Sequence, residues 1–319
     1  MTISAVSAPS RAERAPTGES RPHPLITIIR WELRRLGSSR TLWISALLVF
    51  VLSCLVEVGL ATDPDAQTFP SDVGIRTVKI DWLSNYGLFH TLPTFLGTIL
   101  ALFIPFLCTD GVALDLKRRT HELLMTTAVP SWAYVWGRYL SSLLVSLGLA
   151  CVMLLGIIAV ALGMLHVQPD LVLAPDLRGI LFLWAVLFLP PVLILSGISF
   201  GLGTLYPSLS NLIKVAVLLL WFLDRPIISR LVAGDAGVVW DPTSQSVAAT
   251  PTTGVALTQL AQQTQHLSPA MFLVRLHAWE SQLPDISTWI IPRLAWVGLG
   301  FALVLLASLW FRRFRDARG

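Results

Sequence analysis

Long apolar runs constrain this chain more than any other feature of its sequence. One helix needs about 20 predominantly apolar residues to cross a bilayer. Six runs reach that length or approach it: residues 41–60, 90–108, 136–165, 179–205, 211–223 with their flanks, and 289–311. Only 13% of the 319 residues are charged, against about 25% in soluble domains. The sequence predicts an all-α, polytopic membrane protein with six transmembrane helices.

Two of these runs contain breaks or patterns of their own. The fifth run is the shortest and needs Leu209 or residues 226–231 to reach the length of a span. In the fourth run, Pro190 and Pro191 are expected to interrupt the helix. Gly197 and Gly201 form a small-xxx-small pattern, which permits close contact with a neighbouring helix.

The amino-terminal region divides into a tail and an amphipathic helix. Residues 1–24 are rich in Ser, Pro, Ala and Arg and are predicted to be a disordered cytoplasmic tail, followed by one transmembrane domain over residues 25–319. Over residues 25–36, apolar positions recur at helical spacing and arginines take the other face. This pattern predicts a membrane-interface helix with Arg30, Trp31, Arg34 and Arg35 at the lipid headgroups. The alternative is a positively charged flank of the first span.

The distribution of basic residues predicts the orientation. Of the 23 Lys and Arg residues, sixteen fall in segments that are cytoplasmic if the amino terminus is inside, and seven fall in the outer segments. The positive-inside rule therefore predicts that both termini are cytoplasmic in a multi-pass protein of the plasma membrane. Basic residues flank the apolar runs and form no separate domain, so no nucleic-acid partner is expected.

Two long segments are then outside. Residues 61–89 carry four aspartates and are expected to be solvated. Residues 224–288 form the outer loop between the fifth and sixth spans. Its middle, residues 243–268, is rich in Thr, Gln and Ala and has little to bury, whereas residues 269–282 are predicted to form a short amphipathic surface helix.

A charged island separates the second and third apolar runs at residues 110–139. Six ionisable residues stand from Asp115 to Glu122. Among and after them, three leucines and a threonine recur at the spacing of one face of a helix. These positions are Leu116, Leu123, Leu124 and Thr127. We predict a cytoplasmic coupling helix here, which ends at Pro130 before Ser131 caps the next helix.

The order of residues in this island carries a family resemblance. Within it stand Thr120-His-Glu-Leu-Leu-Met-Thr-Thr-Ala-Val-Pro130, then Ser131-Trp132, then Gly137-Arg138-Tyr-Leu140. This pattern resembles the loop between the second and third spans of type-2 ABC-transporter permeases. That family usually has Gly where this chain has Arg119, and Lys is common where it has Arg138.

The resemblance implies a function and partners. It implies a permease subunit of an ATP-driven transporter, an exporter, with Arg119, Thr120 and Glu122 in the helix that meets a separate P-loop ATPase subunit. It also implies a dimer with a second copy or a related permease. The interfacial helix corresponds to the connecting helix of that family and would contact membrane lipids.

The residues themselves exclude several chemistries. No phosphate-binding Gly-x-x-x-x-Gly-Lys-Ser/Thr motif occurs, so any ATP hydrolysis is expected on a partner chain and not on this one. His121-Glu122 lacks the second histidine of a zinc protease helix, because Met125 takes its place. The spacing of Cys54, Cys108 and Cys151 fits no metal site. We therefore expect no catalytic residue, metal or cofactor.

Two rival functions remain open. The first is an ion-coupled secondary carrier, which usually has ionisable residues deep in the membrane. Glu57, Lys214 and Asp224 lie near the ends of their runs and are interpreted as interfacial anchors, which disfavours a carrier. The second is a membrane scaffold or an intramembrane enzyme with no transport role.

The charge count generates a prediction about topology. Single cysteines at Gln67 and Gln262, in a background without the native cysteines, are expected to react with a membrane-impermeant thiol reagent on intact cells. A cysteine at Ser38 is expected to react only after the cells are opened. Labelling of the Ser38 position alone on intact cells would reverse the predicted orientation.

Overall fold

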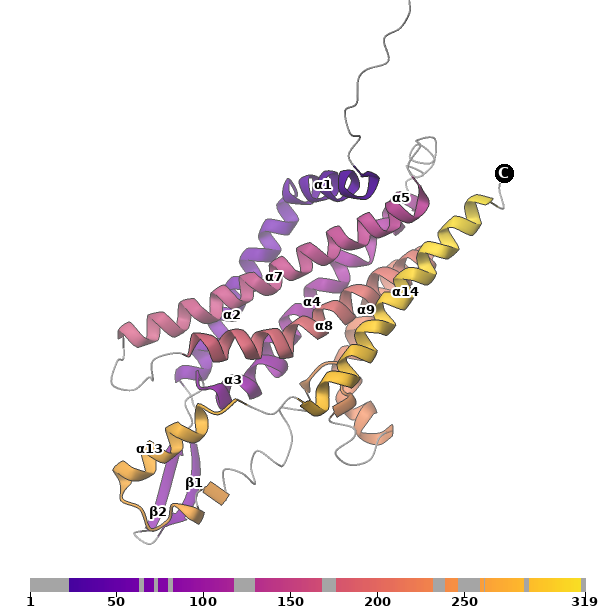
Figure 1. Ribbon diagram of the computed structural model, residues 1–319. Helices are drawn as coiled ribbons and strands as arrows, with labels where there is room; N and C mark the ends of the chain where they lie inside the picture. The colour runs from indigo at the N-terminus through magenta and orange to yellow at the C-terminus, as the bar shows by residue number, and fades with distance from the viewer. Residues whose placement is uncertain are drawn as a thin grey trace, which may run out of the picture.

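Five long helical segments lie side by side and dominate the structure (Figure 1). The computed structural model describes residues 23–62, 66–71, 74–79, 83–117, 130–167, 176–231, 239–245, 259–260, 262–283 and 287–316. Among these residues, five segments are long and apolar enough to cross a membrane: Arg40–Leu60, Asn85–Val112, Ser131–Val167, Leu177–Leu205 and Ser287–Phe311. The chain is therefore a membrane protein built mostly of helices, as its composition predicts.

The apolar runs correspond closely to individual helices. The first, third, fourth and last predicted runs are α2 (Arg40–Thr62), α7 (Ser131–Val167), α8 (Leu177–Leu205) and α14 (Ile290–Asp316, after the short turn Ser287–Trp289). The second run is assembled from consecutive pieces: α3 (Asn85–Thr91), the π-helical turn η1 (Leu92–Leu96) and α4 (Gly97–Cys108), with α5 (Asp110–Lys117) directly after them. The wide turn contains Pro93, which has no N–H for the regular helical bond.

The fifth predicted run gives a helix that differs from the other five. A short turn, η2 (Pro207–Leu209), leads into α9 (Ser210–Leu231), whose 22 residues span about 33 Å at 1.5 Å per residue. Its apolar part, Pro207–Leu223, is shorter than a full span because Asp224 and Arg225 follow it. Five candidate spans are therefore found in the described part of the chain, and the count of six stays a prediction.

Helix α8 occupies the centre of the bundle and packs against α4, α7, α9 and α14. Its side chains Leu187, Phe188, Val192 and Phe200 are nearly inaccessible to solvent and belong to the main hydrophobic core. The expectation that Pro190 and Pro191 interrupt this helix is wrong, because α8 runs continuously through both. Such prolines are tolerated in membrane helices where neighbouring helices and local adjustments compensate for the missing backbone bonds.

The two glycines of the small-xxx-small pattern lie where α8 meets α14. A Cβ atom on Gly197 would stand 2.9 Å from the Cα of Gly300, and one on Gly201 would stand 2.9 Å from the Cβ of Leu303. Because the first obstacle is backbone, a rotamer change cannot relieve it. The predicted close helix contact is confirmed, and α14 is the helix that makes it.

The two ends of the bundle carry different elements (Figure 1). Helix α1 (Pro24–Gly37) lies across the end that also holds α5 and the carboxyl end of α14, and it confirms the predicted amphipathic helix. The opposite end holds an antiparallel hairpin of β1 (Ala66–Ser71) and β2 (Gly74–Lys79), paired from Ala66 with Lys79 to Ser71 with Gly74. The strict all-α prediction is wrong for this hairpin. The sequence does not reveal its two strands, because they lack the regular alternation of apolar and polar residues that is typical of strands.

The segment between α9 and α14 is more structured than its composition suggests. The helix predicted over residues 269–282 is confirmed as α13 (Pro269–Glu280), which packs on α3 and buries Phe272 and Leu276, and its position on the membrane surface stays a prediction. Thr243 and Ser244 are buried as well, and Ser244 Oγ accepts a 2.6 Å hydrogen bond from Arg293 Nη1 of α14. The expectation that this region has little to bury is therefore wrong at residues 243–244, where polar rather than apolar contacts hold the chain.

The α8–α14 contact generates a stability prediction. Gly197→Val is expected to destabilise the purified protein by about 1–3 kcal/mol, because the new side chain meets the backbone of Gly300. Gly298→Val is the control, since Gly298 lies in the same α14 helix and a Cβ there would meet no atom within 4 Å. Thermal unfolding in detergent measures both. Equal midpoints for the two variants would contradict the tight contact.

Candidate functional site

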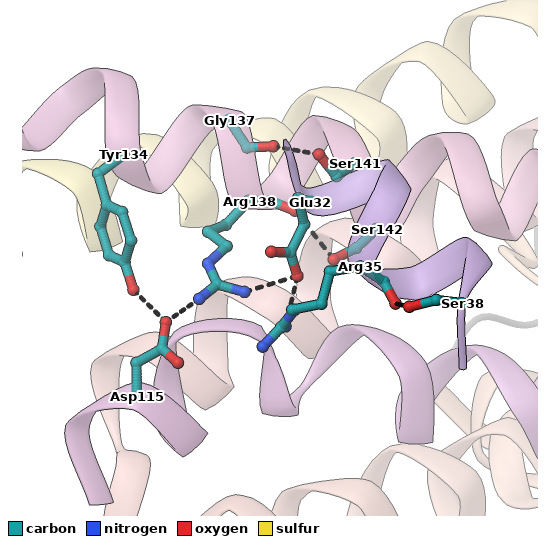
Figure 2. Close-up of polar contacts among 9 residues, drawn as sticks. All are labelled: Glu32, Arg35, Ser38, Asp115, Tyr134, Gly137, Arg138, Ser141 and Ser142. Carbon is teal, nitrogen blue, oxygen red and sulfur yellow. Dashed lines mark hydrogen bonds and ion pairs between the residues drawn. The ribbon is translucent and has the colours of Figure 1, made fainter. Parts of the chain in front are cut away.

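A buried arginine joins three helices at the end of the bundle where α1 lies (Figure 2). Arg138 stands two turns into α7 and is 1% exposed. Its Nη1 donates to Glu32 Oε1 of α1 at 2.5 Å, and its Nη2 donates to Asp115 Oδ2 of α5. Both carboxylates are buried too. Because an isolated buried charge is strongly unfavourable, each of these groups requires the others.

Neighbouring side chains complete this arrangement, which we call the Arg138 cluster: Glu32, Arg35, Asp115, Tyr134 and Arg138 (Figure 2). Tyr134 Oη, one turn before Arg138, donates to Asp115 Oδ2 at 2.6 Å. Arg35 Nη2 donates to the Glu32 oxygen that Arg138 also contacts. The cluster therefore balances two carboxylates against two guanidinium groups.

An aromatic ring and a glycine allow α1 to lie this close to α7. The Trp31 ring centre is 5.6 Å from the guanidinium carbons of both Arg35 and Arg138, a distance typical of cation–π contacts. A Cβ on Gly137 would lie 2.6 Å from Ile28 Cγ2, so any larger residue would push α1 away. The Gly137-Arg138 pair thus has a physical role: the glycine admits α1 and the arginine binds it.

A second ion pair holds the other end of α5. Lys214 Nζ of α9 donates to Asp110 Oδ2 at 2.6 Å, and it lies 3.4 Å from Asn211 Oδ1. Lys214 is 8% exposed and pairs with a neighbouring helix, a contact that its interpretation as an interfacial anchor did not include. Through Asp110 and Asp115, α5 is tied to α9, α7 and α1.

The residues predicted to form the coupling helix begin next to this cluster, and most of them lie outside the described residues. Leu116 lies in α5, directly after Asp115. The remaining predicted residues fall within 118–129, outside the described part of the chain: Arg119, Thr120, Glu122, Leu123, Leu124 and Thr127. Their helical conformation and their apolar face stay predictions.

The predicted interface residues divide into two groups on α1. Arg30, Trp31 and Arg34 are exposed, as a helix lying on headgroups requires, although contact with lipid stays a prediction. Arg35 has a second role that the sequence did not indicate, because it pairs with buried Glu32. One signal for that pairing was available: Glu32 is the single acid among the arginines of α1 and precedes Arg35 by one turn.

The cluster connects three helices through charged side chains. Its carboxylates are neutralised by arginines. Among the residues that the structure describes, no group of three or more His, Cys, Asp or Glu side chains is arranged to hold a metal ion. No model of a known protein family matches the chain, and no curated protein matches it.

The Arg138 cluster generates a second stability prediction. Arg138→Met keeps much of the side-chain volume but leaves Glu32 and Asp115 without their shared partner, so we expect a loss of about 3–5 kcal/mol. Arg34→Met, on the exposed face of α1, is expected to change stability by less than about 0.5 kcal/mol. Thermal unfolding in detergent compares them. A fully stable Arg138→Met protein would show that the ion pairs are dispensable.

Proposed function

We propose that this chain is the membrane-spanning permease subunit of an ATP-driven exporter, coupled to a separate ATPase through residues 110–139. The proposal combines the resemblance of these residues to type-2 ABC-transporter permeases with the bracing of α5 and α7, by which we mean the contacts of Asp115 with Tyr134 and Arg138. These two helices flank residues 118–129, where the ATPase-docking helix is predicted. The bracing is the observation that carries the proposal.

A docking helix transmits force only if its two ends are firmly attached to the spans. Asp115 of α5 stands three positions before residue 118. Its contacts with Tyr134 and Arg138 connect the end of α5 to the beginning of α7, on the two sides of residues 118–129. A displacement at the loop would therefore move both helices together. The pair between Asp110 and Lys214 extends the connection to α9.

Helix α1 is attached to the same helices on which a cytoplasmic partner would act. Glu32 connects it to the same guanidinium that binds Asp115, so α1 moves with α5 and α7. Its exposed Arg30 and Arg34 are available to lipid phosphate or to an acidic partner surface. We propose that α1 lies on the inner membrane surface and that both termini are cytoplasmic.

The proposed assembly contains more than this chain. Including α9, six spans would make half of a translocation unit, so a second copy or a related permease would complete it, with two ATPase subunits on the cytoplasmic side. The broad lipid-facing or partner-facing surfaces of α2 and α14 agree with this view. Large apolar side chains such as Trp43, Leu47, Leu294 and Leu305 are exposed on them.

One observation favours the alternative function of an ion-coupled carrier. Glu57, interpreted from the sequence as an interfacial anchor, is completely buried within α2, so the membrane domain does contain a buried acid. Ionisable groups in such positions occur in proton relays of transporters. The two functions differ in their energy source: export from vesicles that requires ATP hydrolysis supports the first, and export that follows an ion gradient without ATP supports the second.

The docking hypothesis makes a specific prediction for Leu123 and Leu124. Each fully buried leucine contributes roughly 1.5–3 kcal/mol. Leu123→Asp with Leu124→Asp is therefore expected to weaken the ATPase contact by about a hundredfold or more. Purification of the tagged permease from its native membranes, with mass spectrometry of co-purified P-loop ATPases and an ATP hydrolysis assay, measures the effect.

The control for this experiment changes another exposed apolar pair. Tyr206→Asp with Leu209→Asp alters the turn between α8 and α9, where both residues are exposed. This variant is expected to keep its ATPase, whereas the Leu123 and Leu124 variant inserts in the membrane and loses it. Wild-type retention of the ATPase by the Leu123 and Leu124 variant would overturn the docking role.

A further inference from the structure

Helix α2 contacts the bundle through one narrow face. Its buried residues, among the side chains that the structure describes, are Val49, Ser53 and Glu57, spaced by four along the helix. This face meets α7, where a Cβ on Gly156 would lie 3.1 Å from Ser53 Cβ. Cys54 Sγ also donates to the carbonyl oxygen of Gly156. Glu57 therefore points into the contact between the two helices and not toward lipid.

The carboxyl group of Glu57 is buried without any balancing group. Its exposure is 0%, and neither Oε1 nor Oε2 has a hydrogen-bond partner in the structure. Cys54 and Leu60, about one turn away on either side, pack against a small apolar cluster that includes Val160 and Ala161 of α7. Apolar packing thus lies on both sides of Glu57 along α2, and no cation on the described residues pairs with its carboxyl group.

The titratable groups on the neighbouring elements do not supply that cation. Helix α2 packs on α7, α4, α1 and η1. Cys54 of α2 is a thiol and has no positive charge to offer. On α7, the titratable side chains on either side of this contact are Cys151 and His166, and α4 contributes Cys108. Helix α1 carries Glu32 and its arginines at the opposite end of α2, and η1 has no titratable side chain. None of them forms a hydrogen bond or ion pair with Glu57.

Comparison with Glu32 shows what this environment requires. Both glutamates are buried, but Glu32 contacts Arg35 and Arg138. An ionised carboxylate in an apolar site without a counter-charge is far less favourable than the neutral acid, so such a group takes up a proton instead. We propose that Glu57 is a proton-binding site: its carboxyl group carries a proton while α2 is packed against α7, and releases it to water when the two helices separate.

This site makes the α2–α7 contact sensitive to pH. Because Glu57 lies near the end of its apolar run, separation of the helices there exposes the carboxyl group to water, where the ionised form is favourable, so the separated state gains stability as the pH rises. Conversely, proton uptake favours the packed state. The site holds whether ATP or an ion gradient drives transport, because it depends only on the packing of α2 against α7.

Infrared spectroscopy of the purified full-length protein at neutral pH tests the protonation directly. Wild type minus Glu57→Gln is expected to show the carbonyl band of one protonated carboxylic acid per chain, shifted to lower frequency in D2O. Wild type minus Glu32→Gln is expected to show carboxylate bands, because Glu32 is ion-paired. Carboxylate bands for Glu57 in place of the carbonyl band would overturn the proposal.

A stability measurement on the same variants provides an independent test. Glu57→Gln replaces a neutral acid by a neutral amide of equal size, so its thermal midpoint is expected within about 2 °C of wild type. Glu32→Gln removes the partner of Arg138 and is expected to lower the midpoint by at least about 4 °C. A Glu57→Gln protein that fails to accumulate, or melts as low as Glu32→Gln, also counts against a protonated Glu57.

Discussion

A guanidinium group that is 1% exposed needs its charge balanced by its neighbours, and Arg138 meets this need with carboxylates from two other helices. The two contacts constrain more than side chains. Helix α1 has to lie close enough for Glu32 to reach α7, which Gly137 allows by leaving room for Ile28. Helix α5 has to bring Asp115 to the opposite side of the same guanidinium (Figure 2). Moving any one of the three helices separates a buried charge from its partner.

This constraint makes α5 a branching point of the bundle. Asp110 and Asp115 lie five residues apart, which places them on different sides of a helix, and they bind cations from α9 and α7 respectively. The short helix therefore joins elements that are distant in the sequence. Since α5 forms the start of the charged island, the position of this helix relative to the spans is determined by ion pairs and not by apolar packing alone. That arrangement suits a segment proposed to receive force from a partner.

The sequence allowed prediction of features that depend on local composition. Apolar runs predicted the spans, helical periodicity predicted α1 and α13, and Gly197 with Gly201 predicted a close contact without indicating that α14 makes it. Features that depend on a distant partner were not predictable in this way. Glu32 and Arg138 are separated by 106 positions, and Lys214 and Asp110 by 104. Without the fold, each of these charges is indistinguishable from a solvated one.

Local signals also failed where their meaning depends on the surroundings. Proline usually ends a helix, yet α8 continues through Pro190 and Pro191 because neighbouring helices surround it on several sides. The β1–β2 hairpin lies in a segment whose aspartates indicate only solvation. A glutamate near the end of an apolar run suggests an interfacial anchor, but the helical spacing of Val49, Ser53 and Glu57 places this one on the packed face.

Two of the buried glutamates, Glu32 and Glu57, give the two ends of the bundle different mechanical properties. At the end that holds α1, Glu32 belongs to ion pairs that join three helices, and separation would break these pairs. Toward the other end of α2, Glu57 has no partner to lose, and hydration of its carboxyl group compensates for part of the lost packing. Separation of α2 from α7 at Glu57 therefore breaks no ion pair of the described residues, whereas separation of α1 from α7 breaks the pair between Glu32 and Arg138. The charges favour a motion in which α1 and α5 stay attached to α7 while α2 separates from α7 near Glu57.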